Sequence, residues 1–226
     1  MNVLRTLLWP LGMLYGMVNA LRNLCYEWGW MRVHRVGVPV ISIGNITVGG
    51  TGKTPMAEFL LGKLLEMGLK PGYLSRGYGR SSKGFVWVEP GQGDSVLYGD
   101  GHCRSRVGSG IGEWRCARTR LQGRSASFPS RALMYWCWTM RFSTGEIARD
   151  LDVVMVDATQ EPWRDLPLPA GRLREFSRGL RRCHALVVSR RRMGAQSREA
   201  VEVLRQQWPD KVVCRAQLPS QGHPCI

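Results

Sequence analysis

The chain has 226 residues, of which 44% are hydrophobic, enough to build one packed domain and to exclude a largely disordered chain. Its 32 lysines and arginines exceed its 17 acidic residues and give a formal charge of +15. Such a surplus favours polyanionic partners (nucleic acid, nucleotide phosphates or anionic lipid) and does not choose among them. The seven cysteines form no C-x-x-C pair, which argues against a secreted disulfide framework or a zinc ribbon and indicates a reducing compartment.

Apolar residues recur at helical spacing through the N-terminal stretch. The apolar run at 6–21 contains a proline and is shorter than the ~20 residues that a membrane-spanning helix needs. Tryptophans towards both ends suit an interfacial position, where the ring lies among lipid headgroups. We therefore predict a membrane-interface helix within residues 1–35. Two alternatives stay open, namely a helix packed on the domain and a cleaved signal peptide.

From residue 37 the pattern becomes that of an α/β domain. Residues 38–43 are a β-branched run typical of a buried strand, and residues 55–67 carry a helical apolar stripe that ends at Gly68. Further strands are predicted at 73–75, 85–89, 151–157, 184–189 and 211–215, with a helix at 194–208. The order strand, loop, helix, strand is the unit of a parallel sheet. The stretch 101–146 shows neither the helical nor the strand period.

The most specific motif is a glycine-rich turn at 44–55, G-N-I-T-V-G-G-T-G-K-T-P. Glycines allow the backbone to approach a phosphate chain closely, and the following helix turns its positive end toward that chain. Lys53 is expected to reach the β- and γ-phosphates of a nucleotide, and the hydroxyl of Thr54 to ligate Mg²⁺. The residues predicted to bind the nucleotide are Thr47, Gly49, Gly50, Thr51, Gly52, Lys53 and Thr54.

This motif predicts nucleotide binding without deciding between a kinase, an ATPase and a GTPase. Thr47 stands where the standard pattern has its first glycine. Arg76 and Arg80 follow a predicted strand at the same edge of the sheet, so we predict that they contact a phosphate of the donor or the acceptor. Otherwise they are solvated loop charges. Arg172 and Arg174 are further candidates of the same kind.

Several motifs together resemble the tetraacyldisaccharide 4′-kinases of lipid A synthesis. They are V-P-V-I-S-I-G-N-I-T-V-G-G-T-G-K-T-P at 38–55, L-S-R-G-Y-G-R at 74–80, G-D at 99–100 and P-A-G-R-L-R-E at 169–175, with W-P-L-G-M-L-Y-G near the N-terminus. The resemblance covers residues 1–100 and about 147–215. It implies a P-loop NTPase-like three-layer α/β sandwich over 36–226, with a mostly parallel, incomplete sheet, after an N-terminal amphipathic helix.

The same resemblance implies a reaction and its participants. The enzyme would transfer the γ-phosphoryl group of ATP to the 4′-hydroxyl of a tetraacylated glucosamine disaccharide 1-phosphate, with Mg²⁺ as cofactor. Lys53 and Thr54 would hold the phosphates and the magnesium, and Asp100 would help to activate the sugar hydroxyl, although Gly101 follows it where the family has glutamate. The implied location is the cytoplasmic face of the bacterial inner membrane, as a peripheral protein. No nucleic acid and no protein partner are predicted.

One motif of the family is absent. The family has an acidic sequence, roughly L-D-D-x-F-Q-H, shortly before the strand predicted at 151–157. One legal encoding of residues 133–145, regrouped from the last base of the first codon, reads D-V-L-V-L-D-D-A-F-Q-H-R, a hydrophobic strand that ends in this motif. We therefore hypothesise that 101–146 is translated out of frame, with a compensating shift near 146–147.

This hypothesis has physical consequences. Without the acidic pair Mg²⁺ loses protein ligands, and without a central strand its neighbours lose burial. We therefore expect this chain to be inactive and poorly folded. The C-terminal lobe of the family, with its D-H-H-type histidine motif, is also missing from the sequence.

Two other functions stay open. A P-loop ATPase or GTPase switch would hydrolyse nucleotide without the disaccharide acceptor. A non-enzymatic basic membrane- or RNA-binding remnant would bind RNA with a steep salt dependence, but the sequence contains no RNA-binding motif.

Overall fold

The computed structural model describes residues 3–35, 37–75, 85–88, 114–117, 135–139, 145, 147–190 and 195–217. The helices in this part of the chain are α1 (Val3–Glu27), α2 (Lys53–Glu66), the 3-10 helix η1 (Ser177–Arg182) and α5 (Ala195–Gln207). The strands are β1 (Val40–Gly44), β2 (Pro71–Ser75), β3 (Phe85–Val88), β4 (Trp114–Ala117), β5 (Tyr135–Thr139), β6 (Leu151–Asp157), β7 (Ala185–Arg190) and β8 (Val212–Gln217).

These strands form one sheet in the order β3-β4-β2-β5-β1-β6-β7-β8. The pairs are parallel except for β3 with β4, which is antiparallel. At the centre, Ile43 of β1 pairs with Thr139 of β5 on one side and with Val153 of β6 on the other. The turn that follows β1 therefore leaves the carboxyl edge of the sheet near its middle, where open α/β sheets gather their ligands.

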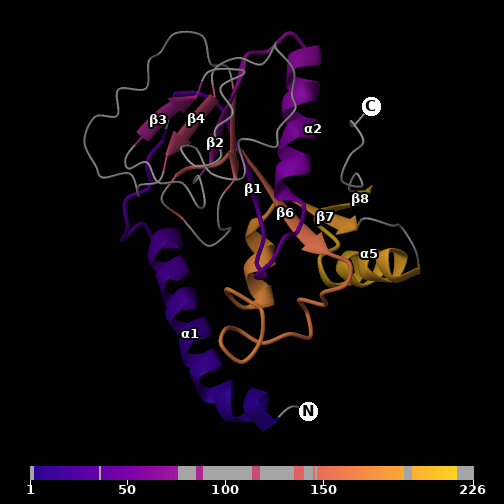
Figure 1. Cartoon of the computed structure of the whole chain (residues 1–226). Helices are drawn as coiled ribbons and strands as arrows, with labels where there is room; N and C mark the ends of the chain where they lie inside the picture. The colour runs from indigo at the N-terminus through magenta and orange to yellow at the C-terminus, as the bar shows by residue number, and fades with distance from the viewer. Residues whose placement is uncertain are drawn as a thin grey trace.

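Helices cover both faces of the sheet (Figure 1). Alternate residues of β6 point to opposite faces, as the strand period requires. Val153 and Met155 pack with Ala57 and Leu61 of α2, whereas Val154 and Val156 join the larger cluster of the other face. That cluster includes Leu180 of η1 and three residues of α5, namely Ala200, Val201 and Leu204. The predicted three-layer α/β sandwich with a mostly parallel sheet is confirmed.

The predicted elements of the regular parts are present with small shifts. The strand predicted at 151–157 has these bounds in β6, and the helix predicted at 194–208 is α5. The largest shift that concerns the site is at α2, which begins at Lys53 instead of residue 55. Gly68, predicted to end this helix, has φ of 75°, a conformation that favours glycine after a helix.

One expectation for 101–146 is wrong. The stretch has no helical or strand period, yet it contributes β4 and β5, and β5 is a central strand between β1 and β2. Tyrosine, tryptophan and threonine favour strands, so the sequence Y-W-C-W-T can form a strand between two parallel neighbours although its polar and apolar residues do not alternate. The central strand that we expected to be lost is therefore present.

Helix α1 packs on the domain by one face, which is one of the alternatives drawn from the sequence. One face, with Gly12, Gly16 and Asn23 buried, packs on the segment 165–176 that follows β6. The opposite face exposes a row of apolar side chains, each at least 55% accessible: Leu7, Leu11, Leu14, Met17, Val18 and Leu21. Among the helices of the described residues, none has the length and apolar character needed to cross a membrane.

Candidate functional site

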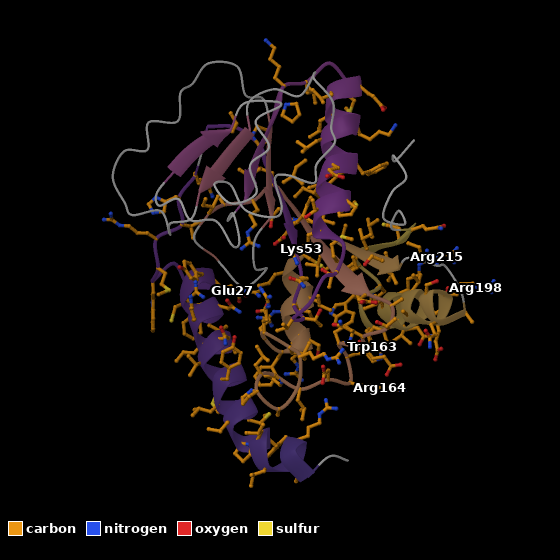
Figure 2. The ribbon with its side chains drawn as sticks, viewed as in Figure 1. Glu27, Lys53, Trp163, Arg164, Arg198 and Arg215 are labelled. Carbon is orange, nitrogen blue, oxygen red and sulfur yellow. The ribbon has the colours of Figure 1, made fainter. Side chains whose placement is uncertain are left out.

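The glycine-rich turn connects β1 to α2 at the centre of the sheet. Gly49 has φ of 127° and Gly52 has φ of 80°, a region that side chains with a Cβ rarely enter. Gly52 is the N-cap of α2, so Lys53 and Thr54 are the first two residues of the helix. Lys53 lies at the sheet end of α2, near the middle of the molecule (Figure 2).

The backbone of this turn is available for an anion. Within the described part of the chain, no acceptor is recorded for the amides from Gly49 to Gly52. The N-terminal end of α2 adds the positive end of the helix dipole at the same place. An anion is the ligand that satisfies several such amides together.

Buried side chains fix the shape of the turn from both sides. Asn45 Nδ2 donates to the carbonyl oxygen of Thr47 at 2.7 Å. Ser189 Oγ, at the end of β7, donates to the carbonyl oxygen of Thr51 at 2.8 Å. Asn45 and Ser189 are each only 1% exposed, so these bonds are shielded from water. The turn is thus held in shape by the protein itself.

Lys53 is a partly desolvated cation. Burial, and then the nearby charge of Arg174, lower the pKa of Lys53 to about 8. Among the described residues no carboxylate forms an ion pair with it. Two neighbouring cations at the mouth of an amide-lined turn repel each other, and an anion placed between them removes that repulsion. The electrostatics therefore favour a polyanion such as a polyphosphate.

The segment that carries Arg172 and Arg174 lies directly on the turn. Arg174 N donates to the carbonyl oxygen of Ile46 at 2.7 Å, and Val48 N donates to that of Arg172 at 2.8 Å. Between these bonds, Thr47 and Leu173 form an antiparallel bridge. The two arginines, which the sequence offered as further candidates, thus belong to a short strand-like segment beside the phosphate loop.

The residues present fit a triphosphate better than they fit a complete magnesium site. The hydroxyl oxygens of Thr47 and Thr51 are buried and lack a partner among the described residues. Thr54 lies in the first turn of α2, as its predicted role requires. In the described part of the chain, no group of three or more His, Cys, Asp and Glu side chains could hold a metal ion. At the end of β6, one carboxylate oxygen of Asp157 already accepts from Thr159.

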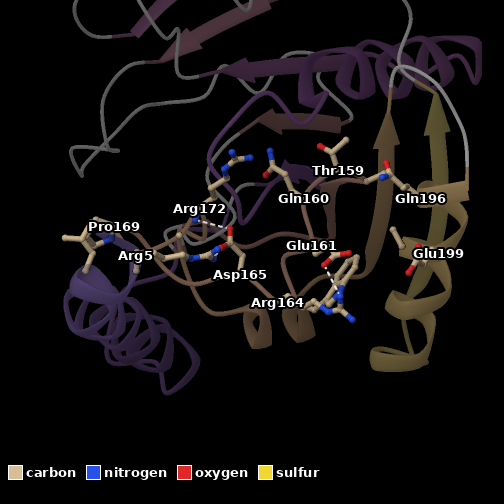
Figure 3. Close-up of a pocket in the computed structure, with 16 residues that line it drawn as sticks. Arg5, Thr159, Gln160, Glu161, Arg164, Asp165, Pro169, Arg172, Gln196 and Glu199 are labelled. Carbon is tan, nitrogen blue, oxygen red and sulfur yellow. Dashed lines mark hydrogen bonds and ion pairs between the residues drawn. The ribbon is translucent and has the colours of Figure 1, made fainter. Parts of the chain in front are cut away.

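A cavity of about 860 Å³ adjoins the loop (Figure 3). The residues that connect it to the loop are Gln160, whose Nε2 lies 3.5 Å from the Cβ position of Gly49, and Arg172. Its lining is polar and apolar in about equal parts and comes from the start of α1, the segment after β6 and the start of α5. Ion pairs join Arg5 to Asp165 and Arg164 to Glu161 within this lining. Lys53 does not line this cavity.

The structure brings together some of the predicted residues and leaves others untested. The turn residues from Thr47 to Thr54 share one site. Arg76, Arg80 and Asp100 lie outside the described residues. Sequence reasoning missed Asn45 and Ser189, which shape the turn. The position of Asn45 within the motif could have drawn attention to it, whereas a serine at the end of a distant strand gives no such signal.

Comparison with known proteins decides the family. The sequence pattern of the family described as Tetraacyldisaccharide-1-P 4'-kinase (LpxK) matches residues 4–103 and 142–222. The chain belongs to this family. It is 37% identical to the tetraacyldisaccharide 4'-kinase of Chlorobaculum tepidum over 207 residues, which are 88% of this chain and 59% of the relative. It is 38% identical to that of Xanthomonas euvesicatoria pv. vesicatoria over 180 residues, or 77% of this chain and 50% of the relative.

A solved member of the family has the same fold. The crystal structure of LpxK from Aquifex aeolicus in complex with ATP superimposes with a TM-score of 0.69 at 22% identity. The match covers 98% of this chain and 85% of that one. The chain spans 50 to 59% of the length of the two curated relatives named above.

The family match is interrupted where the sequence departs from the family. The matched stretches leave out 104–141, which lies within the part that we hypothesise to be out of frame. Residues on both sides of it match the family pattern. The match also includes 101–103 and 142–146, the two ends of the hypothesised stretch. Sequencing of the gene tests the hypothesis.

Proposed function

We propose that this chain derives from an enzyme for the ATP-dependent 4′-phosphorylation of a tetraacyl glucosamine disaccharide 1-phosphate, the reaction for which its family is named, and that the chain as written binds the nucleotide without transferring phosphate. The observation that carries the proposal is the strand–loop–helix turn with a partly buried ammonium, Lys53, near the charge of Arg174. The ATP complex of the structurally similar LpxK supports ATP as the donor. The family supports the lipid A precursor as the acceptor.

The proposed roles follow the geometry of the turn. The amides of 49–54 hold the phosphates in a fixed place, and the ammonium of Lys53 stabilises the negative charge on the γ-phosphate. Thr54 would hold Mg²⁺, which when bound neutralises charge on the transferred group. We further propose that Asp100 activates the acceptor hydroxyl and that Arg76 and Arg80 contact a phosphate.

The cavity beside the loop is proposed to receive the sugar part of the acceptor. The polar side chains of its lining supply donors and acceptors for hydroxyl groups, and Trp163 supplies a flat apolar surface of the kind that packs against a sugar ring. Leu8 of α1 also lines the cavity. The exposed apolar face belongs to the same helix as Leu8, so acyl chains of an acceptor bound in the cavity could run along α1 into the lipid phase.

Attachment to the inner-membrane surface is proposed to use the apolar face of α1. The apolar row sits on a helix that is already docked by its other face, as expected for a helix lying in the membrane surface. Co-sedimentation with anionic phospholipid vesicles tests this. The triple substitution Leu11→Gln, Leu14→Gln and Val18→Gln should abolish sedimentation, while Phe59→Gln with Met67→Gln, at exposed apolar positions on and next to α2, should leave it unchanged.

A transfer assay separates the proposed function from its alternatives. The full-length gene product with its reading frame restored is incubated with γ-labelled ATP, Mg²⁺ and the disaccharide 1-phosphate. Labelled lipid should form only when the acceptor is present, and the chain as written should bind ATP without transferring phosphate. Phosphate release without acceptor would favour the ATPase or GTPase switch. Salt-dependent RNA binding without nucleotide binding would favour the RNA-binding remnant.

A further inference from the structure

Helix α1 and the phosphate loop are joined by one short segment. Residues 165–176 contact α1 on one side and the loop on the other. In Figure 1 the chain that follows β6, drawn in orange, lies between α1 and the strands. A helix whose only task is membrane attachment has no need to contact the part of the chain that lines the nucleotide site.

The contact with α1 depends on two glycines one turn apart. A Cβ at Gly12 would lie 2.7 Å from the carbonyl oxygen of Pro167, and a Cβ at Gly16 would lie 2.6 Å from the ring of Phe176. Both distances are shorter than a Cβ normally tolerates. The helix therefore touches the backbone of the segment at Gly12 and the side chains of Phe176 and Pro167 at Gly16. The docking face of α1 therefore fits the segment at both of these positions.

Polar contacts fix the two ends of the same interface. Near the start of α1, Arg5 forms an ion pair with Asp165, whose carboxylate also accepts from Arg172 N at 3.0 Å. Near its end, Asn23 Nδ2 donates to Glu175 Oε2 at 2.7 Å. Glu175 is 2% exposed and directly follows Arg174. Polar groups of α1 thus hold residues on both sides of the part that touches the loop.

On its other side, the segment fixes three consecutive loop residues. The amide of Arg174 binds the carbonyl of Ile46, Thr47 pairs with Leu173, and the amide of Val48 binds the carbonyl of Arg172. Leu173 is 1% exposed in the core. A displacement of the segment therefore has to move the loop or break these bonds, because packed interiors transmit displacements instead of absorbing them.

We propose that α1 is a positioning element of the nucleotide site, and that Gly16 and Asn23, by docking α1 on residues 165–176, hold the phosphate loop in its binding conformation. This rests on the proposed function insofar as the ligand of the loop is ATP. Linkage requires the converse as well: nucleotide bound at the loop must strengthen the docking of α1.

Matched substitutions test the proposal. Gly16→Ala introduces the clashing Cβ, whereas Gly62→Ala makes the same change in α2, where a Cβ meets nothing within 4 Å. Asn23→Ala removes the bond to Glu175, whereas Asn19→Ala removes a bond to Tyr15 O within α1 itself. Each pair changes helix propensity equally, so a difference within a pair reports on the docking contact.

Two measurements are made on all four variants. The first is the affinity for a fluorescent ATP analogue, which Gly16→Ala and Asn23→Ala should weaken about tenfold, within the usual range of coupling between sites. The second is hydrogen exchange, which should become faster at the amides of Val48 and Arg174 and stay unchanged in β7. The two control variants should behave as the unmodified chain does in both measurements.

The outcomes separate the proposal from the function on which it rests. Unchanged affinity and exchange in Gly16→Ala and Asn23→Ala would overturn the proposal, as would an equal increase of exchange throughout the sheet, which indicates general destabilisation. If the unmodified chain binds no ATP analogue in a Lys53-dependent way, the proposed function fails. The exchange at Val48 and Arg174 then still decides whether α1 positions the loop.

Discussion

Strands β1 and β5 are neighbours at the centre of the sheet, paired in parallel from Val40 with Trp136 to Ile43 with Thr139. They end at the same edge, and their sequences differ there. After β1 come the glycines, the lysine and the threonine of the phosphate loop. At the end of β5 stand Thr139 and Met140, the positions where the frame hypothesis places the acidic pair.

This difference shows that a strand and a site make different demands on sequence. A central strand needs residues of high β propensity and two neighbours with unpaired backbone groups, and many sequences meet these conditions. A phosphate or magnesium site needs particular side chains at particular positions. A shift of reading frame can therefore preserve a strand and remove the chemistry that it carries.

The largest effect is expected when the acidic pair is restored. If the frame hypothesis is correct, the two aspartates replace Thr139 and Met140, and the first of them lies beside Ile43 at the end of β1. The double substitution Thr139→Asp with Met140→Asp should make the binding of an ATP analogue depend on Mg²⁺. The gain in affinity should be about a hundredfold at millimolar Mg²⁺, because a bound metal neutralises the charge of the phosphate oxygens.

The control for this experiment is Thr139→Asn with Met140→Asn. The amides have nearly the same shape as the carboxylates and lack the charge that Mg²⁺ requires. An equal gain in this control, or a gain that persists in EDTA, would show that the pair acts by shape alone and would contradict the frame hypothesis.

The next largest effect is expected for Lys53→Ala. Removing an ammonium that binds phosphate should weaken the affinity for ATP by about 10- to 100-fold, as for a hydrogen bond to a charged group. Lys63→Ala is the matched control, because Lys63 lies in the same helix and forms an exposed ion pair with Glu66 at 2.6 Å. Equal affinities of the two variants, measured by fluorescence titration, would show that the turn does not hold the phosphates.

The regular parts of the fold could be predicted because their signals are local. The hydrophobic run of β6 gave its bounds, and the apolar stripe of α2 gave that helix apart from its first turn. The first turn was missed because Lys53 and Thr54 are polar and follow a glycine, so that tertiary contacts decide their conformation. Strand β5 was missed because its residues do not alternate, and its place between β1 and β2 is a long-range property.

The site could be predicted only as far as its motif extends. The turn of 49–54 is contiguous in sequence, and its chemistry can be derived from glycine and lysine alone. The contact of the turn with 172–174 joins positions more than a hundred residues apart, and a sequence without an alignment holds no record of such pairs. The same reason applies to the carbonyl of Thr51 and its donor Ser189.

That last contact gives a prediction about stability. Ser189→Ala leaves the buried carbonyl of Thr51 without its donor and should lower the free energy of unfolding by about 1–3 kcal/mol. Ser177→Ala, at the start of η1, is the control and should change it by less than about 0.5 kcal/mol. Urea unfolding measures both, and it also tests the expectation that the chain as written is poorly folded.

The smallest effect is a proton taken up when the nucleotide binds. With its pKa lowered to about 8, Lys53 is half protonated in the free protein at that pH. A bound polyphosphate favours the ammonium, so the pKa rises on binding and the complex takes up about half a proton at pH 8 and almost none at pH 6.5. Affinity should consequently fall as the pH rises above 8. Calorimetry in two buffers of different ionisation enthalpy measures the uptake, and Lys53→Arg should abolish it because a guanidinium stays charged throughout this range.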